Sequence, residues 1–585
     1  MQYDECTKSL GAFSQKYKCI NKWKGHDGRI LASAITVHDS QQYYITGGSD
    51  NSVSIWNISD CQLSGSGTGE VQDDILIKSL GEFVSFKTIS SKPDHAEDCR
   101  RGATFLRTLL KKYGAQTEML ITDNHHNPVV FARFRGNPAK STTRKKILFY
   151  GHYDVVPADN KKGNWIIDPF QMKGINGYLY GRGVSDNKGP IMAALYGVVD
   201  CINEKELDSD IIFLIEGEEE SGSRGFQDAV RRHKELIGDI DYILLANSYW
   251  LDDEVPCLTY GLRGVLHATI IVNSNHPDVH SGVDGSFMMD EPLFDLTAIL
   301  AKLKGRNNRV QIPGFYDKVI PLTNTEEALY DDIADTLIRR NPELGPAETL
   351  KASLMARWRE PNLTVHRYWV SGPEGSLVSS QAKASISVRL VPNQEVDEII
   401  KNLTTFLKNT FAGLDSHNNL TITVDNEAEP WLGNPDNEIF QTLEEAIMEV
   451  WGPIGNGLQN STPGLKHSRR DINDSVSPSL KPTPATTLTL TNGSDHTSLA
   501  TIPVDSEQTS IGDEGGKGRK PLYIREGGSI PSIRFLEKEF GAPAAHLPCG
   551  QASDSAHLEN ERLRLNNLYK SREIFRRVFR ELPKK

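Results

Sequence analysis

Hydrophobic positions change period along the chain and predict alternating helices and strands. Residues 97–113 carry apolar side chains three and four positions apart, which is the spacing of an amphipathic helix. Apolar runs at 129–132, 146–150 and 211–215 have the length of buried strands. Because strand-like and helix-like runs alternate to about residue 262, we expect an α/β domain whose central mixed sheet carries helices on its faces.

The pattern changes after residue 263. Alternating, β-branched stretches at 264–272 and 384–391 bracket helical patterns at 290–304 and 325–340. This order predicts an α+β insert between two halves of the α/β domain. The expected boundaries are 71–263 for the first half, 264–427 for the insert and 428–585 for the second half.

Within the segment 1–62, which we expect to be all-β, residues 21–58 have the pattern of short strands and turns. Its Gly25-His26, Gly47-Gly48-Ser49-Asp50 and Ile55-Trp56-Asn57 resemble one partial WD40 repeat, and no second copy follows at a 40-residue period. One blade cannot bury its own faces. Either more blades lie upstream of Met1, which we favour, or the segment is a remnant. The Ser- and Gly-rich stretch 63–70 is expected to be a linker.

Composition and charge exclude several classes of function. The 585 residues carry a formal charge of −12, which argues against sequence-independent binding to nucleic acid or to an anionic membrane. Apolar runs are too short to span a bilayer, and the start lacks a secretory signal. Seven scattered cysteines are typical of a reducing compartment, so we expect a cytoplasmic protein. Residues 458–519, rich in Ser, Thr, Pro and Gly, predict a disordered insertion.

Imidazole and carboxylate groups gather at predicted strand ends and turns. They lie in His152-Tyr153-Asp154, in the Gly-rich stretch around Asp186, in Glu216-Gly217-Glu218-Glu219-Glu220, and at His557. Each has a simpler explanation alone: a hydrogen-bonded loop histidine, a β-turn before a helix at 190–201, or a solvated acidic face. Together they are the ligands that zinc or a similar divalent ion prefers, and the absence of cysteine from the set suits a catalytic site.

With these motifs, residues 71–585 resemble the dinuclear zinc metallopeptidases that include cytosolic non-specific dipeptidase, carnosinase and aminoacylase. Other matching stretches are Tyr260-Gly261-Leu262-Arg263-Gly264, His280-Ser281-Gly282, Val388-Arg389-Leu390-Val391-Pro392 and Arg525-Glu526-Gly527-Gly528-Ser529-Ile530-Pro531. The resemblance implies a hydrolase of small peptides, with the insert acting as the lid and dimerisation domain of a homodimer.

The resemblance also implies a role for each matching residue. Asp186 bridges two Zn²⁺ or Mn²⁺ ions, Glu220 and His557 hold one of them, and His152 holds the other. Asp154 orients His152, and Glu219 is the general base that takes a proton from the attacking water. The residues implied to contact substrate are His280, which in relatives reaches across a dimer, Ser376, Ser529 and Arg389, which forks onto the substrate carboxylate.

One position departs from the family pattern. The remaining ligand of the His152 metal is an Asp in the family, and the aligned residue here is Asn247. A neutral amide oxygen coordinates more weakly than a carboxylate. We therefore expect the His152 metal to be weakly held or absent, while the metal at Glu220 and His557 persists.

The order of segments, a WD40-like unit before a dipeptidase-like domain, resembles a fungal peptidase-like subunit of a glutathione-degrading complex. That resemblance implies a glutamine-amidotransferase-like partner and cleavage of the γ-glutamyl bond. Two alternatives stay open: an autonomous di- or tripeptidase acting for example on Cys-Gly, and a catalytically silent scaffold, which Asn247 would favour.

Overall fold

The structure is a computed structural model that describes residues 69–123, 126–140, 144–159, 163–282, 289–452 and 520–584, together with the backbone of six strands between residues 2 and 57. Contacts divide the chain into two units, residues 1–64 with 458–517 and residues 65–457 with 518–585. The predicted insertion 458–519 lies outside the described residues.

The first unit contains two antiparallel three-stranded sheets. They are built from β1 (Gln2–Asp4), β2 (Ser9–Phe13) and β3 (Cys19–Lys24), and from β4 (Ile30–His38), β5 (Gln41–Gly48) and β6 (Val53–Asn57). The strands β4, β5 and β6 lie within residues 21–58, where short strands were predicted, whereas β1 and β2 precede that range. The WD40 assignment stays a prediction. The helix α1 (Gly69–Ser85) begins inside the last two positions of the predicted linker, whose other residues lie outside the described part.

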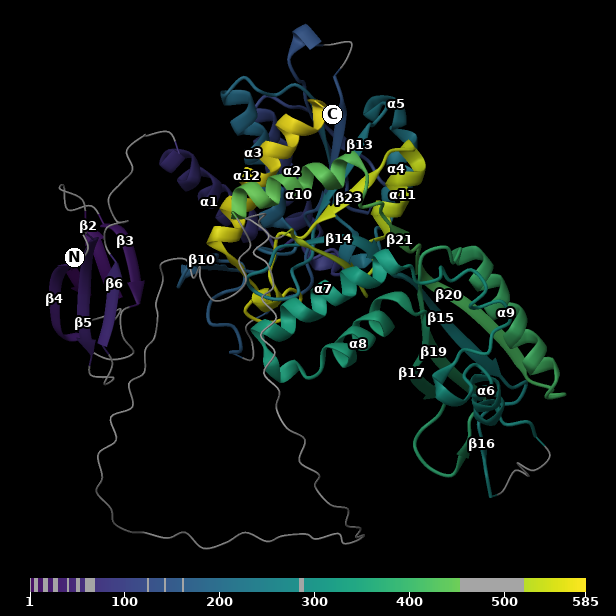
Figure 1. Ribbon diagram of the computed structural model, residues 1–585. Coiled ribbons are helices and arrows are strands. Elements are labelled where there is room, and N and C mark those ends of the chain that lie inside the picture. The colour runs from purple at the N-terminus through teal and green to yellow at the C-terminus, as the bar shows by residue number, and fades with distance from the viewer. Residues whose placement is uncertain are drawn as a thin grey trace, which may run out of the picture. The chain divides into compact units, whose positions relative to one another are not determined.

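Nine strands of the described residues form one mixed sheet in the second unit (Figure 1). Their order is β21 (Trp431–Leu432), β14 (Cys257–Leu262), β23 (Ala544–Leu547), β13 (Tyr242–Ala246), β9 (Lys146–His152), β12 (Asp210–Glu216), β8 (Val129–Phe134) and β7 (Gln116–Leu120), and β22 (Leu522–Glu526) pairs with β14. Because β9 runs parallel to both β12 and β13, the carboxyl ends of these three strands meet at one edge. The predicted mixed sheet is confirmed.

Helices cover both faces of this sheet, as predicted. They are α2 (Ala96–Lys112), α3 (Lys188–Asn203), α4 (Phe226–Arg232), α5 (Lys234–Ile237), α10 (Glu438–Trp451), α11 (Pro531–Phe540) and α12 (Leu565–Glu581). The helices α3 and α12 pack side by side (Figure 1), and a Cβ at Gly197 would lie 2.9 Å from Phe575. Glycine at position 197 therefore permits the close approach of these two helices.

The insert has its own four-stranded antiparallel sheet. Its order is β17 (Asn362–Val370), β19 (Gln381–Leu390), β15 (Gly264–Asn273) and β20 (Asn419–Ala428). The helices α6 (Pro292–Ala301) and α9 (Val396–Ala412) bury apolar side chains against one face of the sheet. The α+β content predicted for the insert is therefore present, although the stretches that became β17, β20 and α9 were not recognised in the sequence.

Two further helices lie between the insert and the large sheet. The helices α7 (Asn324–Arg340) and α8 (Ala347–Arg359) lie side by side (Figure 1). They share a hydrophobic cluster with β22 and with Trp250. They fall inside the range predicted for the insert, yet their apolar contacts are with the edge of the large sheet. They therefore join the two parts of the unit.

A small sheet brings two distant loops together. Its strands are β10 (Lys173–Ile175), β11 (Tyr178–Tyr180) and β24 (Arg562–Arg564). The pairing of Tyr180 with Arg562 places the loop that contains Asp186 beside the loop that contains His557.

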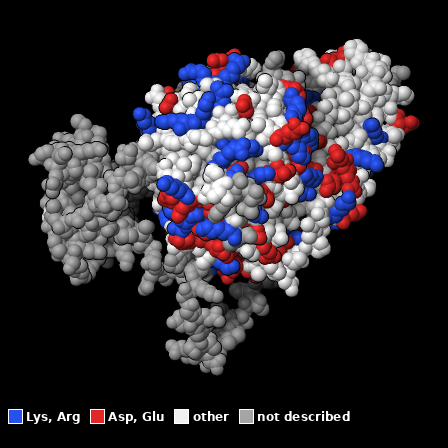
Figure 2. Space-filling model, turned by 90° about the horizontal axis from the view of Figure 1, so that it is seen from above, with Lys and Arg blue, Asp and Glu red and all other residues white. Residues whose placement is uncertain are grey.

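Basic and acidic side chains are intermixed on the face shown in Figure 2. Among the described residues, no helix has the length and apolar character needed to cross a membrane.

Candidate active site

The candidate site lies at the edge where β9, β12 and β13 end. His152 is the last residue of β9 and pairs with Glu216, the last residue of β12. The turn after β12 contains the short 3₁₀ helix η5 (Glu219–Ser221), and Asn247 directly follows β13. The sequence argument that strand ends would collect these side chains is therefore confirmed.

Asp186 is the centre of a cluster of metal-ligand side chains. His152 Nε2 lies 3.0 Å from Asp186 Oδ1, and His557 Nε2 lies 3.0 Å from Asp186 Oδ2. His557 Nε2 is also 3.1 Å from Glu220 Oε1. Ligand atoms of His152, Asp186 and Glu220 lie within 4.8 Å of one another. Side chains from both halves of the α/β domain thus meet at one point.

The donor set fits a divalent ion. Two imidazoles and two carboxylates without a thiolate are the ligands of catalytic zinc and of similar ions. Two ligands bound at about 2.1 Å to one tetrahedral ion lie about 3.4 Å apart. The 3.0 and 3.1 Å separations of His557 from Asp186 and Glu220 are close to that spacing. These three residues would hold one ion, and Asp186 with His152 would hold another.

The carboxylates of the cluster raise the pKa of both imidazoles. Hydrogen bonds to Asp186 and Glu220 raise the pKa of His557 to about 10. Burial opposes the charged form of His152, but the charge of Glu219 and hydrogen bonds to Asp154 and Asp186 raise the pKa of His152 well above its ordinary value. The cluster therefore attracts positive charge, which a divalent ion can supply in place of two protons.

Asp154 orients both the first imidazole and the acidic turn. Its carboxylate is fully buried and lies 3.5 Å from His152 Nδ1. It accepts hydrogen bonds from the backbone N–H groups of Glu219 at 3.2 Å and Glu220 at 3.0 Å, and from Ser90 Oγ at 2.7 Å. The geometry is that of an outer carboxylate which fixes the orientation of the metal ligands.

Glu561 is a positioning residue that the sequence argument missed. Its buried carboxylate accepts the backbone N–H groups of Gly183, Ser185 and Asp186 at 2.9, 3.0 and 3.1 Å, and pairs with Arg182 Nη1 at 2.6 Å. Arg182 Nη2 also donates to Leu558 O at 3.0 Å, next to His557. Glu561 thus holds the backbone of the Asp186 turn. Its spacing of four residues from His557 was a signal that could have drawn attention to it.

Asn247 occupies the expected position beside the first imidazole. Its Nδ2 lies 3.3 Å from His152 Nε2, and its Oδ1 accepts the backbone N–H of Ser248 at 2.5 Å. The amide nitrogen rather than the oxygen therefore faces His152, and the side chain adds no negative charge to the site.

Restoring the carboxylate at this position is expected to strengthen the second metal site. Asn247→Asp adds one charge next to His152 and Asp186, so the number of tightly bound ions should rise from one to two per chain. Metal analysis of dialysed protein measures the ratio. A wild-type chain that already retains two ions would contradict the expectation.

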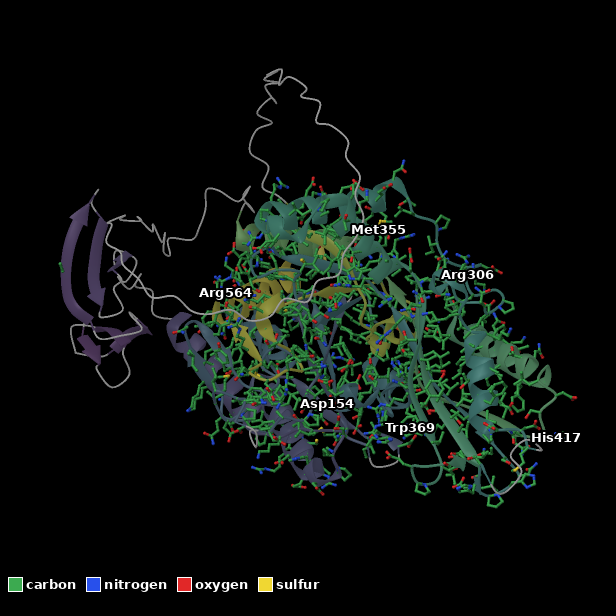
Figure 3. The ribbon with its side chains drawn as sticks, turned by 90° about the horizontal axis from the view of Figure 1, so that it is seen from below. Asp154, Arg306, Met355, Trp369, His417 and Arg564 are labelled. Atoms are coloured by element: carbon green, nitrogen blue, oxygen red, sulfur yellow. The ribbon has the colours of Figure 1, made fainter. Side chains whose placement is uncertain are left out.

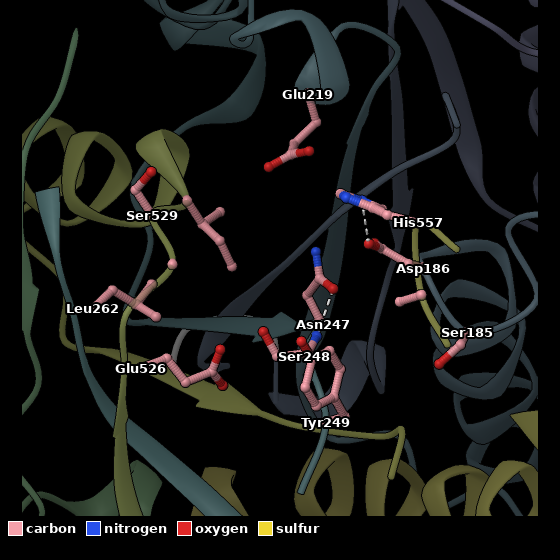
Figure 4. A pocket seen from close by; sticks show the side chains of 13 residues that line it. Ser185, Asp186, Glu219, Asn247, Ser248, Tyr249, Leu262, Glu526, Ser529 and His557 are labelled. Atoms are coloured by element: carbon pink, nitrogen blue, oxygen red, sulfur yellow. Dashed lines mark hydrogen bonds and ion pairs between the residues drawn. The ribbon is translucent and has the colours of Figure 1, made fainter. Parts of the chain in front are cut away.

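A pocket of about 200 Å³ opens beside the cluster (Figure 4). Its wall includes Asp186, Glu219, Asn247 and His557 of the cluster, and also Ser185, Ser248, Tyr249, Leu262, Glu526, Gly528, Ser529, Ile530 and Ala556. Burial raises the pKa of Glu526 to about 7, and this carboxylate accepts Thr259 Oγ1 at 3.0 Å. The volume is below that of sites for drug-sized ligands, so a small substrate fits it.

The structure brings only one of the four predicted substrate residues to this pocket. Ser529 lines it, whereas Arg389 is half-buried on β19 and does not. His280 and Ser376 are exposed near the two-stranded ribbon of β16 (Val279–His280) and β18 (Leu377–Val378), where Ser281 N donates to Ser376 O at 3.0 Å. The roles of His280, Ser376 and Arg389 stay predictions.

Behind the acidic turn, Glu216 is buried with three hydroxyl donors. Tyr150, Ser532 and Ser223 donate to its Oε1 at 2.5, 2.8 and 3.0 Å, while its Oε2 has no partner among the described residues. Burial raises the pKa of Glu216 to about 7, above its ordinary value of 4.5. The buried carboxylate is thus more readily protonated in the folded chain than in the unfolded chain.

Because protonation of Glu216 is linked to folding, this residue should lower the free energy of unfolding as the pH rises. Its folded pKa lies above the unfolded value, so its stabilising contribution is full below pH 4.5 and is lost as the pH passes about 7. Between low and high pH, the free energy of unfolding of Glu216→Gln should therefore fall by about 3 kcal/mol less than that of the wild-type chain. Urea unfolding at pH 5 and pH 8 measures it, and equal pH slopes for both chains would refute it.

The fold and the cluster of metal-ligand side chains are typical of the class of metal-dependent peptidases. The sequence pattern of Peptidase family M20/M25/M40 matches residues 148–467, and the chain belongs to this family.

The chain is 35% identical over 597 residues to the probable di- and tripeptidase DUG2 of Saccharomyces cerevisiae, covering 96% of this chain and 60% of that protein. It is 30% identical to the Cys-Gly metallodipeptidase DUG1 of Candida albicans, over 84% of this chain and 91% of that protein. Among solved structures, the dipeptidase Dug1p of Saccharomyces cerevisiae shares the fold with a TM-score of 0.65 and 24% identity, over 88% of this chain and 97% of that one.

Proposed function

We propose that this chain hydrolyses small peptides with the help of one or two divalent ions, with zinc as the first candidate. The proposal rests on one observation: beside a small pocket, His557 Nε2 lies 3.0 Å from a carboxylate oxygen of Asp186 and 3.1 Å from one of Glu220. A divalent ion at such a site supplies Lewis acidity toward the scissile carbonyl and lowers the pKa of water. The similarity to the named di- and tripeptidases supports the same substrate class.

Glu219 is the proposed general base. It lines the pocket, and its Oε2 lies 4.0 Å from His152 Nε2. Burial and the repulsion of Glu220 and Asp186 raise its pKa well above the ordinary value, although His152 opposes the shift. A carboxylate with a raised pKa accepts a proton from water and returns it to the leaving amine more effectively than an ordinary one.

We further propose that the chain works in cytoplasmic glutathione degradation with a glutamine-amidotransferase-like partner that cleaves the γ-glutamyl bond. The order of segments along the chain and the 35% identity to DUG2 support this assignment. Autonomous cleavage of Cys-Gly is the second candidate, favoured by the 30% identity to a Cys-Gly metallodipeptidase. A silent scaffold is the third, favoured by Asn247.

One set of assays separates these functions. The isolated chain is incubated with Cys-Gly and added Zn²⁺ or Mn²⁺, and turnover supports the autonomous peptidase. Glutathione cleavage that begins only after the partner is added supports the complex. A complex that keeps full activity with Glu219→Gln would identify the chain as a scaffold, because the loss of a general base costs a hydrolase several orders of magnitude.

We propose that the chain forms a homodimer through its insert. The terminal strand β17 of the insert sheet exposes Tyr368, Trp369 and Val370 by 47, 41 and 48%. Trp369 is labelled in Figure 3. Exposed apolar side chains on an unpaired strand edge are typical of protein interfaces.

Charge at this edge is expected to break the dimer. Trp369→Glu places a carboxylate on the apolar edge, so the mass measured by light scattering should fall to that of a single chain. Phe294→Glu, at another exposed aromatic of the insert, is the control and should leave the mass unchanged. A dimeric Trp369→Glu chain would place the interface elsewhere.

A further inference from the structure

The strands β9 and β13 separate before they reach the candidate active site. They pair in parallel up to Tyr150 and Leu245, although β9 continues to His152 and β13 to Ala246. On its other side, β9 stays paired with β12 as far as His152. The gap therefore opens between β9 and β13, at the point where these two strands lead to His152 and Asn247.

The side chain of Asn187 fills this gap. Its Oδ1 accepts the backbone N–H of His152 at 3.2 Å, and its Nδ2 donates to the carbonyl oxygen of Ala246 at 2.5 Å. Continuing the parallel register of the two strands would join that N–H directly to that carbonyl. The amide of Asn187 is thus inserted into one hydrogen bond of the sheet. Because a direct bond measures about 2.9 Å, the insertion holds the strand ends apart by the width of an amide group.

The surrounding residues leave room for this amide. Asn187 is fully buried, and a Cβ at Gly151 would lie 2.8 Å from Asn187 Oδ1 and 2.9 Å from Ile191 Cγ1. A side chain at position 151 would therefore collide with the amide. Asn187 also directly precedes α3, where asparagine commonly caps a helix, but within the described part of the chain its side chain makes no capping hydrogen bond. The amide is used to bridge the two strands rather than to cap the helix.

Asn187 is linked to three of the candidate metal-ligand positions. It follows Asp186 in the chain, it binds the backbone of His152, and it binds the carbonyl of the residue before Asn247. Asp186 and Asn247 line the same pocket (Figure 4). We propose that Asn187 is a positioning residue whose side chain acts as a wedge between β9 and β13 and sets the separation of His152 from position 247. Because this role concerns a metal position, it rests on the proposed function.

The wedge should affect the two ion positions unequally. Glu220 lies in η5 and His557 in the loop before β24, so neither follows β9 or β13 in the chain. Without the wedge, β9 and β13 can pair directly, which moves the backbone of His152 toward position 247. That movement disturbs the arrangement of His152 and Asp186, whose Nε2 and Oδ1 lie 3.0 Å apart. The ion position at His152 should therefore weaken more than the position at Glu220 and His557.

The crystal structure of the metal-free Asn187→Ala chain tests the wedge itself. The backbone N–H of His152 should then donate directly to Ala246 O, at about 2.9 Å. Asn187→Ser, whose side chain is too short to reach both strands, should show the same closure and serves if the alanine variant does not fold. Strand ends as far apart as in the wild-type chain would overturn the inference. The result depends on neither metal binding nor turnover, so it separates failure of this inference from failure of the proposed function.

Zinc titration in competition with a chelator tests the effect on the ion positions. The wild-type chain and Asn247→Asp are compared, each with and without Asn187→Ala. In both backgrounds, Asn187→Ala should weaken the second, weaker binding step at least tenfold and change the first step less than threefold. Equal weakening of both steps, a second step that is unchanged, or a second step that is absent from both backgrounds would overturn the positioning role.

Asn418→Ala is the matched control. Asn418 is also buried, and its Nδ2 likewise bridges two acceptors, Asp290 O at 3.0 Å and Asp295 Oδ2 at 2.8 Å, but it lies in the insert. Its loss should lower the thermal stability of the chain and leave both binding steps unchanged. Thermal unfolding confirms that each variant is folded at the temperature of the titration. A control that weakens the second step as much as Asn187→Ala does would reduce Asn187 to a role in stability and overturn the inference.

Discussion

Replacing Glu219 with Gln is expected to lower kcat for small peptides by about two to four orders of magnitude. Glu219 faces the pocket 4.0 Å from His152 Nε2, where it can take the proton of the attacking water. A glutamine keeps the size of the side chain but has no lone pair of comparable basicity. The effect should fall on kcat rather than on KM, because the interaction is made in the transition state.

Metal content distinguishes loss of the base from loss of the site. Glu219→Gln should retain the ions of the wild-type chain, because the proposed metal ligands are other residues, Asp186, Glu220 and His557. The exposed Glu559→Gln is the matched control and should keep wild-type kcat. Turnover in Glu219→Gln within tenfold of the wild type would remove Glu219 from the mechanism.

Glu561→Gln is expected to lower metal affinity about 10- to 100-fold, although Glu561 contacts no metal ligand side chain. Its carboxylate accepts four donors, including the backbone N–H of Asp186 and the guanidinium of Arg182. An amide turns an NH₂ group toward some of these donors and leaves Arg182 buried without its counter-charge. The expected loss of stability is about 3 to 5 kcal/mol, as for other broken buried ion pairs.

Two readouts separate a positioning role from a purely structural one. Competition with a chelator measures the metal affinity of Glu561→Gln at a temperature where circular dichroism shows the chain to be folded. Glu559→Gln, two residues away and exposed, should bind metal like the wild type. A folded Glu561→Gln chain with unchanged metal affinity would limit Glu561 to a role in stability.

The strands and helices of the α/β domain could be predicted because their periods are clear. The stretch 146–150 became β9 (Lys146–His152), and 97–113 became α2 (Ala96–Lys112). The helix α9 was missed although its apolar face is regular and Pro392 and Gly413 mark its two ends. β17 was missed because its outer half is exposed and lacks a hydrophobic alternation.

The part of the site that could be predicted is the part whose residue types alone indicate metal binding. Imidazoles and clustered carboxylates pointed to His152, Asp186, Glu220 and His557, and these four meet in space. Glu526 was not found because its position on the pocket wall depends on the pairing of β22 with β14, which no local pattern reveals. The position of Asn187 between β9 and β13 likewise arises only from the arrangement of distant elements.

Metal analysis of Asp186→Asn beside the wild type tests the central claim most directly. Asp186 Oδ1 and Oδ2 each lie 3.0 Å from an imidazole nitrogen, so its loss should dismantle both ion positions. After dialysis, mass spectrometry should find one tightly held divalent ion in the wild-type chain and none in a folded Asp186→Asn chain. A wild-type chain without a bound ion, or an Asp186→Asn chain that binds as much metal as the wild type, would contradict the account.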